Sequence, residues 1–332
     1  MKKGEWINVG VIGLGKMGLL HASLLSVLPN VKLVALCDKN GLIRKVCKRL
    51  FHDAFITDDV ERLTGLGLDA VYVTTPIPSH YPVVKKVCLL NVARNLFVEK
   101  TLAASYNDAE EMCLLAKRLG GVNMVGYMKR FAVTFMKGRE LLNELAVGEV
   151  SSFEAYAYSS DFVDAKAGSI TGSRGGVLGD LGSHAFDLAL WYFGDLKVDS
   201  ACLKFLSGSK LEDEASIKVS CPSGVEGQFD ISWCKEGYRM PEVGIVIRGT
   251  KGVMKVTDDE VKVELKDGRS YKWFRHDLKD NVGFLLGGPE YYREDKHFIK
   301  SILAGDRAEP DFSTAAKVDF LIDKLRGMCQ KE

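Results

Sequence analysis

Short apolar runs alternate with stretches of helical periodicity over the first 126 residues. The apolar runs, which we interpret as strands, are residues 7–12, 33–37, 70–74, 96–98 and 122–125. Between them, residues 42–50, 80–90 and 105–119 have the apolar spacing of amphipathic helices. Strands alternating with helical crossovers predict a doubly wound parallel sheet, whose ligands lie beyond the carboxyl ends of the strands.

Beyond residue 126 the pattern changes to consecutive strands. A helical segment at 133–145 is followed by strand-like stretches at 150–159, 201–206, 215–221, 225–234, 243–249, 252–256, 261–265 and 269–274, and helical periodicity returns at 289–303 and 312–325. Turn signals such as Pro222-Ser223-Gly224 favour antiparallel pairing. We therefore predict an α/β chain of two domains: residues 1–126 with the parallel sheet, and residues 127–332, an α+β domain with a large, mainly antiparallel open sheet. Because such a sheet has a face and edges to cover, we expect a homodimer or homotetramer.

A glycine pattern marks the first strand–helix–strand unit. Residues 9–12 lead into Gly13, Gly15 and Gly18, and the next strand ends at Asp38. In a dinucleotide site these glycines permit a sharp turn, close approach of a pyrophosphate and close helix packing, and the acid binds a ribose diol. The spacing predicts such a site, and glycines that merely turn the chain are the alternative.

The acid at the end of the second strand also bears on the choice of cofactor. Asp38 favours NAD because its carboxylate would repel a 2′-phosphate. Lys39 and Arg44 lie close in sequence and could soften this repulsion. We expect NAD as the cofactor and leave NADP open.

Two further strand ends carry unusual residues. After residues 70–74, the prolines of Thr75-Pro76-Ile77-Pro78-Ser79-His80 fix a loop at the expected mouth of a cofactor cleft. After residues 96–98 the chain delivers Glu99 and Lys100, a charged pair at the crevice. A surface salt bridge at a strand terminus is the alternative for this pair.

Glycines introduce a segment of the second domain that contains Asp180 and His184. If a helix begins near Asp180, the two side chains share a face, because they are four residues apart. A carboxylate beside an imidazole can form a general acid/base pair. An N-capping aspartate and a structural histidine are the alternative.

Composition limits the partners and the compartment. The 332 residues are 46% hydrophobic and 27% charged with a net charge of +1, so we expect neither nucleic acid nor membrane as a partner. The N-terminal apolar stretch is interrupted by Asn8 and Lys16, which argues against a secretory signal. Eight scattered cysteines show no zinc spacing, so we expect no metal and, with Cys37, Cys88 and Cys202 in apolar runs, buried free thiols in the cytoplasm.

Taken together, the motifs resemble the Gfo/Idh/MocA family of NAD(P)-dependent oxidoreductases along essentially the whole chain. The resemblance rests on VIGLGKMG at 11–18, TTPIPSH at 74–80, FVEK at 97–100 and GGVLGDLGSHAFDLALW at 175–191. It implies an N-terminal Rossmann domain and a C-terminal α/β domain whose sheet supports oligomerisation.

The resemblance also implies roles for individual residues. Lys100, Asp180 and His184 would form the catalytic trio, with His184 as acid/base, Asp180 supporting it and Lys100 polarising the reacting oxygen. The segment GYMKRF places Tyr127, Met128 and Arg130 near nicotinamide or substrate. The expected cofactor contacts are Gly13, Leu14, Gly15, Lys16, Met17, Gly18, Asp38, Thr75, Pro76, His80, Glu99, Lys100 and Met128. The expected substrate contacts are Lys100, Tyr127, Arg130, Asp180 and His184.

One position departs from the family pattern. The family usually has proline after the glutamate–lysine pair, where this chain has Thr101. A cis bond before a non-proline residue is disfavoured by a few kcal/mol more than before proline. We therefore expect a trans peptide between Lys100 and Thr101, with an altered pose of Lys100.

These features predict a dehydrogenase that oxidises or reduces a secondary alcohol or ketone of a polyol, sugar or nucleotide sugar. A non-catalytic dinucleotide sensor or repressor is one alternative, and a glycosidase with resident NAD is another. The aromatic residues of segment 233–239 and the pair Tyr291-Tyr292 could stack on a sugar, although core or interface packing is the more common fate of such residues.

Overall fold

The computed structural model describes residues 6–162, 174–206, 210–279, 282 and 288–329. The chain divides into two compact units. Residues 1–127 and 284–320 form the first, and residues 128–283 and 321–332 form the second. Our division of the sequence placed residues 284–320 in the second domain, whereas the structure places them in the first unit.

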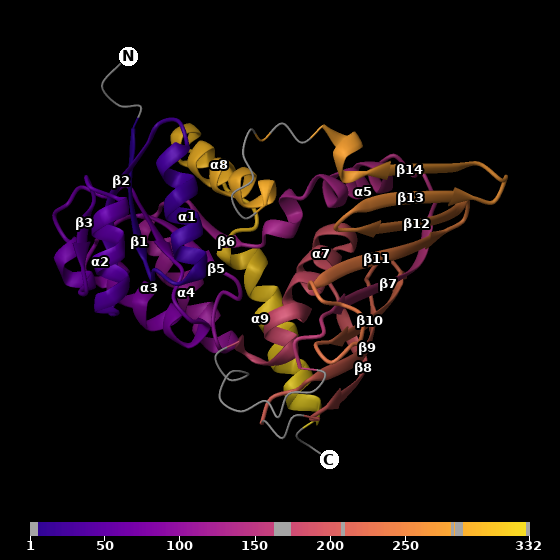
Figure 1. The fold of residues 1–332 in the computed structure, drawn as a ribbon. Helices are drawn as coiled ribbons and strands as arrows, with labels where there is room; N and C mark the ends of the chain where they lie inside the picture. Colours follow the sequence, from indigo (N-terminus) through magenta and orange to yellow (C-terminus); the bar gives the residue numbers. More distant parts are fainter. Residues whose placement is uncertain (1–5, 163–173, 207–209, 280–281, 283–287, 330–332) are drawn as a thin grey trace. The chain divides into compact units, whose positions relative to one another are not determined.

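Six parallel strands form the sheet of the first unit in the order β3-β2-β1-β4-β5-β6 (Figure 1). They are β1 (Ile7–Ile12), β2 (Val31–Cys37), β3 (Phe55–Thr57), β4 (Ala70–Val73), β5 (Asn95–Glu99) and β6 (Asn123–Gly126). This order is that of a doubly wound dinucleotide-binding sheet, so the predicted fold class is confirmed for this unit.

Helices connect these strands and return to them from the end of the chain. They are α1 (Lys16–Val27), α2 (Gly41–Leu50), α3 (His80–Leu89), α4 (Tyr106–Leu119), α8 (Pro289–Ala304) and α9 (Phe312–Cys329), the last of which continues into the second unit. Local signals set their ends: the Ser105 side chain accepts the N–H of Asp108 at the start of α4, and Gly120 ends it with a φ of +66°. α8 packs against α1 and β6.

The second unit contains an eight-stranded sheet in the order β14-β13-β12-β11-β7-β10-β9-β8 (Figure 1). Its strands are β7 (Val150–Tyr158), β8 (Lys197–Lys204), β9 (Glu214–Ser220), β10 (Glu226–Ser232), β11 (Glu242–Gly249), β12 (Gly252–Thr257), β13 (Glu260–Leu265) and β14 (Ser270–Phe274). Only β10 and β7 pair in parallel among these strands. The mainly antiparallel sheet is therefore confirmed, with β7 between two antiparallel meanders.

Two helices of the second unit pack on this sheet. α5 (Val133–Asn143) contacts β12 and β13, and α7 (Ser183–Phe193) contacts β7 and β11. Phe229 of β10 lies edge-on to Phe153 and Phe186, and all three rings are buried. Along the strands buried and exposed positions alternate, so side chains such as Glu154, Lys218 and Arg248 point away from this core.

The cysteines are free thiols wherever their side chains are described, and Cys329 lies outside that part. Cys37 and Cys88 are buried as we expected. Cys202 is exposed, which corrects the prediction for this residue. It lies on β8, the edge strand of the second sheet, where an apolar run does not guarantee a buried side chain.

Candidate active site

The glycine loop joins β1 to α1 and leaves a place for an anion. Gly13 has a φ of +92°, and a Cβ atom on Gly18 would lie 1.8 Å from the Gly13 carbonyl oxygen, so both positions require glycine. A Cβ atom on Gly15, by contrast, would meet no described atom within 4 Å. Within the described residues, no side chain caps α1 and its first turn has no acid, so its N–H groups suit a pyrophosphate.

Asp38 closes the loop from the end of β2. Its Oδ2 atom accepts the N–H of Leu14 at 2.6 Å, and its Oδ1 atom accepts the N–H of Asn40 at 2.7 Å. A carboxylate has lone pairs left for a ribose diol after two such bonds. The loop and the acid together fit the dinucleotide that the sequence predicts. Leu14 is fully buried, so it would contact a dinucleotide through its backbone alone.

The proline loop after β4 is tied to the glycine loop. Thr74 donates its hydroxyl to the Gly13 carbonyl at 2.5 Å. Thr75 and Pro76 lead into a short 3₁₀ turn, η2 (Ile77–Ser79). His80 follows and is fully buried, with Nε2 2.7 Å from the Thr75 carbonyl oxygen and Nδ1 2.9 Å from that of Thr101. The His80 ring thus contacts two backbone segments, and the cofactor contact that we expected for it stays a prediction.

The turn after β5 presents Lys100. Glu99 is 8% exposed and Lys100 is half-buried. One oxygen of Glu99 lies 2.9 Å from Nε2 of His21, and the other accepts the backbone N–H of Lys100 at 3.1 Å. Both oxygens are thus engaged within the first unit, and the cofactor contact that we expected for Glu99 stays a prediction. Lys100 keeps the exposure that a substrate contact requires.

The peptide bond between Lys100 and Thr101 is cis, so the trans bond that we predicted is wrong. Tertiary contacts define the backbone here. Thr101 is 3% exposed, its carbonyl faces His80, and its hydroxyl donates to the Ala103 carbonyl at 3.2 Å. Such surroundings outweigh the local preference on which the prediction relied.

Asp180 and His184 lie on one continuous helical segment of the second unit. A π-helical turn, η4 (Leu178–Gly182), carries Asp180 and passes directly into α7, where His184 is the second residue. Both residues are half-buried. Asp180 and His184 therefore lie on a helix, as predicted. The π-helical turn that precedes α7 is of a kind often found at functional sites.

Arg174 pairs with Asp180, a contact that sequence reasoning missed. Its Nε atom donates to Asp180 Oδ2 at 2.8 Å, and its Nη2 atom lies 2.9 Å from Asp161 Oδ2. The guanidinium also lies over the rings of Phe162 and Trp233. This pairing favours the ionised form of Asp180. No periodicity marks Arg174 in the sequence, because its partners come from separate segments.

Two residues that we expected to contact substrate are buried. Tyr127 is fully buried and packs in the core, so its contact with substrate stays a prediction. Arg130 is 5% exposed and donates to both oxygens of Asp187, at 2.6 to 3.1 Å. A bidentate buried pair of this kind occupies the guanidinium and gives Arg130 a structural role. Met128 is half-buried and stays a candidate cofactor contact.

The aromatic segment 233–239 is mainly structural as well. Trp233 is fully buried and donates its indole N–H to Asp213 Oδ1 at 2.8 Å. Tyr238 packs against Tyr158 of β7. These contacts agree with the core packing that we gave as the more common alternative.

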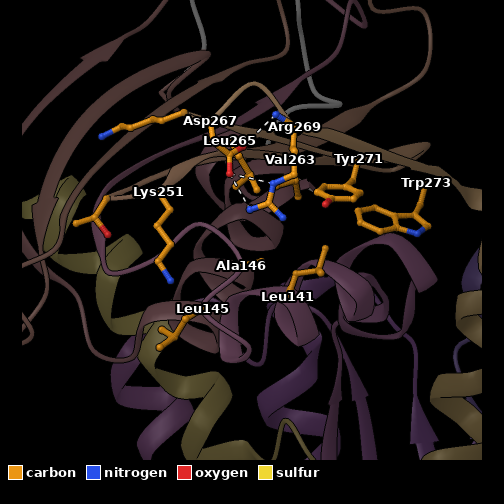
Figure 2. Close-up of a pocket in the computed structure, with 12 residues that line it drawn as sticks. Leu141, Leu145, Ala146, Lys251, Val263, Leu265, Asp267, Arg269, Tyr271 and Trp273 are labelled. Atoms are coloured by element: carbon orange, nitrogen blue, oxygen red, sulfur yellow. Dashed lines mark hydrogen bonds and ion pairs between the residues drawn. The ribbon is translucent and has the colours of Figure 1, made fainter.

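A pocket of about 610 Å³ lies in the second unit between the end of α5 and the strands β13 and β14 (Figure 2). Figure 2 shows Leu141 below Tyr271 and Trp273, and Leu145 below Lys251. None of the predicted site residues lines this pocket. It is therefore separate from the candidate active site.

Comparison with models of known families identifies the family of this chain. A family model described as an oxidoreductase family with an NAD-binding Rossmann fold matches residues 7–127. A model of the GFO/IDH/MocA C-terminal domain matches residues 135–255. The chain belongs to the Gfo/Idh/MocA family. The protein is an NAD-dependent oxidoreductase, so the enzyme class and the cofactor that we predicted from the sequence motifs are both confirmed.

Named relatives of this oxidoreductase are dehydrogenases. It is 25% identical over 322 residues to myo-inositol 2-dehydrogenase of Thermotoga maritima, covering 90% of this chain and 89% of that protein. It is 29% identical over 325 residues to 1-carboxy-3-chloro-3,4-dihydroxycyclo hexa-1,5-diene dehydrogenase of Comamonas testosteroni, covering 91% and 78%. The fold matches levoglucosan dehydrogenase in complex with NADH and levoglucosan, with a TM-score of 0.88 at 19% identity over 98% and 97% of the two chains. The sensor and glycosidase alternatives gain no support from these relatives.

Proposed function

We propose that this oxidoreductase is a dehydrogenase that interconverts a secondary alcohol and a ketone on a polyol, a sugar or a nucleotide sugar. The observation that carries the proposal is the continuous helical segment that presents Asp180 and His184, in a chain whose glycine loop is open for a dinucleotide. A sensor needs the loop but has no use for a proton-transfer pair. Relatives that are named as inositol dehydrogenases support the substrate class.

In this proposal each site residue has one task. The bound cofactor supplies the hydride acceptor or, when reduced, the donor. Lys100 donates a hydrogen bond to the reacting oxygen and polarises it. His184 exchanges the proton of that oxygen at Nε2, because its Nδ1 atom is buried. Asp180, kept ionised by Arg174, stabilises the protonated imidazole.

The local charges support NAD as the preferred cofactor. Asp38 would face the ribose diol and repel a 2′-phosphate. Arg44 donates to the carbonyls of Asp38 and Lys39 at 2.7 Å and pairs with Asp58 at 3.1 Å, so its charge is already engaged. Lys39 is exposed, which leaves NADP as a second possible cofactor for the same site.

Two further features concern the molecule in the cell. The open sheet of the second unit, with its edge strands β14 and β8, supports our proposal of a homodimer or homotetramer. Light scattering in solution measures the assembly, and a monomer at micromolar concentration would contradict the proposal. Free thiols support a reducing compartment such as the cytoplasm. Among the described residues, no helix combines the length and the apolar character that crossing a membrane requires.

Absorbance at 340 nm tests the function directly. We expect reduced cofactor to form with NAD and one class of polyol or sugar. We expect His184→Ala to lower kcat by roughly 10²- to 10⁴-fold without weakening NAD binding, because only proton transfer is removed. His297→Gln, in the first unit, is the matched control and should keep full activity. If the protein binds NAD but turns over no substrate of the panel, the sensor or the resident-cofactor glycosidase becomes the better explanation.

A further inference from the structure

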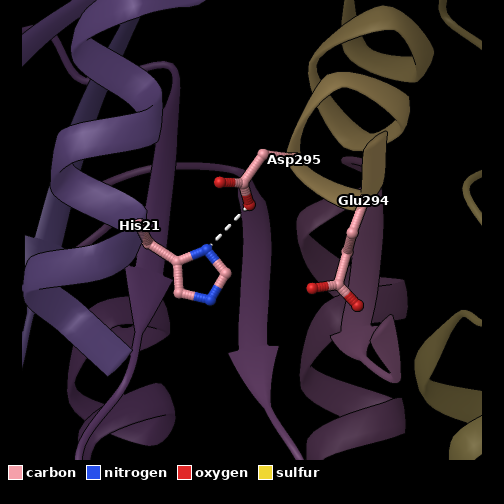
Figure 3. A group of neighbouring side chains, drawn as sticks. All are labelled: His21, Glu294 and Asp295. Carbon is pink, nitrogen blue, oxygen red and sulfur yellow. Dashed lines mark hydrogen bonds and ion pairs between the residues drawn. The ribbon is translucent and has the colours of Figure 1, made fainter. Parts of the chain in front are cut away.

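A buried histidine, His21, contacts Glu99, the residue that precedes Lys100. His21 belongs to α1, and Figure 3 shows its ring pointing from that helix toward Asp295 of α8. The Nδ1 atom lies 2.8 Å from Asp295 Oδ1, and both side chains are 0% exposed. Because α8 follows the sheet of the second unit in sequence, this contact joins the two sequence-distant parts of the first unit.

The other side of the same ring faces Glu99. Nε2 of His21 lies 2.9 Å from Glu99 Oε1, while Glu99 Oε2 accepts the backbone N–H of Lys100 at 3.1 Å. An unbroken line of hydrogen bonds thus runs from Asp295 through His21 and Glu99 to the backbone of Lys100. A side chain alternates faces along a strand, so Glu99 shares its face of β5 with Phe97, which packs on the His21 ring at 5.1 Å.

The surroundings of His21 are apolar and acidic. From β4 the ring meets Tyr72, at 5.6 Å, and from α8 it meets Tyr291, at 6.2 Å. The charged groups that face it are Glu99 from β5 and the fully buried Asp295 and Glu294 from α8. His21 therefore lies beside three acidic side chains and, when protonated, offsets part of their charge.

The contacts favour the protonated form of the ring. Both nitrogens lie beside carboxylate oxygens, and an imidazole donates from both only when it is protonated. Burial by itself would lower the pKa of His21, but the charges and hydrogen bonds of Asp295 and Glu99 raise the pKa well above its ordinary value.

A metal ion is the other occupant that this cluster could suggest. Ligand atoms of His21, Glu294 and Asp295 lie within 4.8 Å of one another (Figure 3). A protonated imidazole has no lone pair for a metal, and a neutral ring that bound one would give up a carboxylate contact. The geometry therefore favours a hydrogen-bonded ion network over a metal centre.

We propose that His21 is a positioning residue: held by Asp295, it fixes the Glu99 carboxylate that holds the backbone of Lys100. The inference rests on the proposed function, in which Lys100 contacts the reacting oxygen. It adds that the pose of this lysine depends on a buried charge contributed by α8. Removing the charge of Asp295 should lower the pKa of His21, so that the ring loses a proton within the working pH range and releases Glu99.

Asp295→Asn is the test variant, because an amide keeps the shape and an acceptor oxygen while removing the charge. His297→Gln on the same helix is the control, since His297 contacts the backbone N–H of Glu309 and lies outside the network. The first readout is hydrogen exchange of the Lys100 amide together with the ring ¹⁵N shifts of His21, between about pH 6 and 9. We expect the wild type and the control to show a protected amide and a ring protonated throughout. In Asp295→Asn the ring should titrate, and Lys100 protection should fall by about tenfold at the alkaline end.

The second readout is the pH profile of turnover on a substrate found at 340 nm. In Asp295→Asn, kcat should fall by about tenfold to a hundredfold as the pH rises, while the dissociation constant of NAD stays within about twofold. A purely structural role would lower the yield or the melting temperature without a new pH-dependent step. Unchanged Lys100 protection in a folded Asp295→Asn variant would overturn the inference. Wild-type protein that turns over nothing but shows the expected exchange would instead count against the proposed function alone.

Should Asp295→Asn fail to fold, Glu99→Gln provides a second variant. It leaves the His21–Asp295 pair intact and replaces one carboxylate by an amide. We expect faster exchange of the Lys100 amide, by about threefold to tenfold, with His21 still protonated. Exchange identical to that of the wild type would contradict the proposal.

Discussion

Lys100 lies between two buried histidines that are fixed in different ways. His21 holds the residue before it, through the carboxylate of Glu99, and His80 holds the residue after it, through the carbonyl of Thr101. Both rings are fully buried and both have two oxygen partners within 2.9 Å. The partners of His21 carry charge, and those of His80 are backbone carbonyls.

This difference gives the two rings opposite pKa shifts. For His80, burial is the dominant cause and lowers the pKa, and the carbonyls of Thr75 and Thr101 offset only part of the effect. For His21, the carboxylates reverse the effect of burial and raise the pKa. A neutral His80 has one N–H, so only one of its two contacts can be a hydrogen bond at a time. Burial alone thus does not decide the charge of a histidine; the charge of its partners does.

The largest expected effect comes from removing each ring. His21→Phe leaves Asp295 and Glu99 buried without a counter-charge, so we expect the unfolding free energy of the first unit to fall by about 3–5 kcal/mol. His80→Phe removes the single N–H that the carbonyls of Thr75 and Thr101 share, and we expect a loss of about 1–3 kcal/mol. Hydrogen exchange of the β1, β4 and β5 amides measures both losses. Equal losses would show that the charge of the partners does not matter.

The next effect is on the pH dependence of stability. The lowered pKa of His80 means that the unfolded chain binds more protons below about pH 6.5, so stability falls as the pH drops through this window. The raised pKa of His21 means that the folded chain binds more protons above about pH 6.5, so stability falls as the pH rises toward the folded pKa. Each limb should have a slope of up to about 1.4 kcal/mol per pH unit.

Variants separate the two limbs. We expect His80→Gln to flatten the acid limb alone, and Asp295→Asn to move the alkaline limb to lower pH. Denaturant titrations at a series of pH values measure the difference between each variant and the wild type, so that other ionisable groups largely cancel. An acid limb that persists in His80→Gln would assign it to another group.

Local sequence determines much of this fold. The apolar runs of the first unit appear as β1, β2, β4, β5 and β6, and the glycine loop lies where the spacing predicts. β3 was missed because it has three residues at the sheet edge, too few for a pattern. The parallel pairing of β10 with β7 was missed because α7 and two strands separate them in sequence.

The site is less predictable than the fold, because its contacts are non-local. Glu99 precedes the predicted catalytic Lys100 and Arg130 belongs to the GYMKRF segment, so their sequence context suggested ligand contacts. Their partners, His21 and Asp187, come from helices that no local signal connects to them. His21 itself resembles any polar residue on a helix until α8 brings Asp295 to it.

The late arrival of α8 has a consequence for biosynthesis. His21 and Glu99 leave the ribosome with the first half of the chain, whereas Asp295 follows only after the whole sheet of the second unit has been translated. At typical rates of roughly 5–20 residues per second, the interval is on the order of ten seconds. Throughout that time the nascent first unit lacks one wall of its core and one charge of its network. The half of the protein that is made first therefore cannot complete its core until nearly the whole chain has been made.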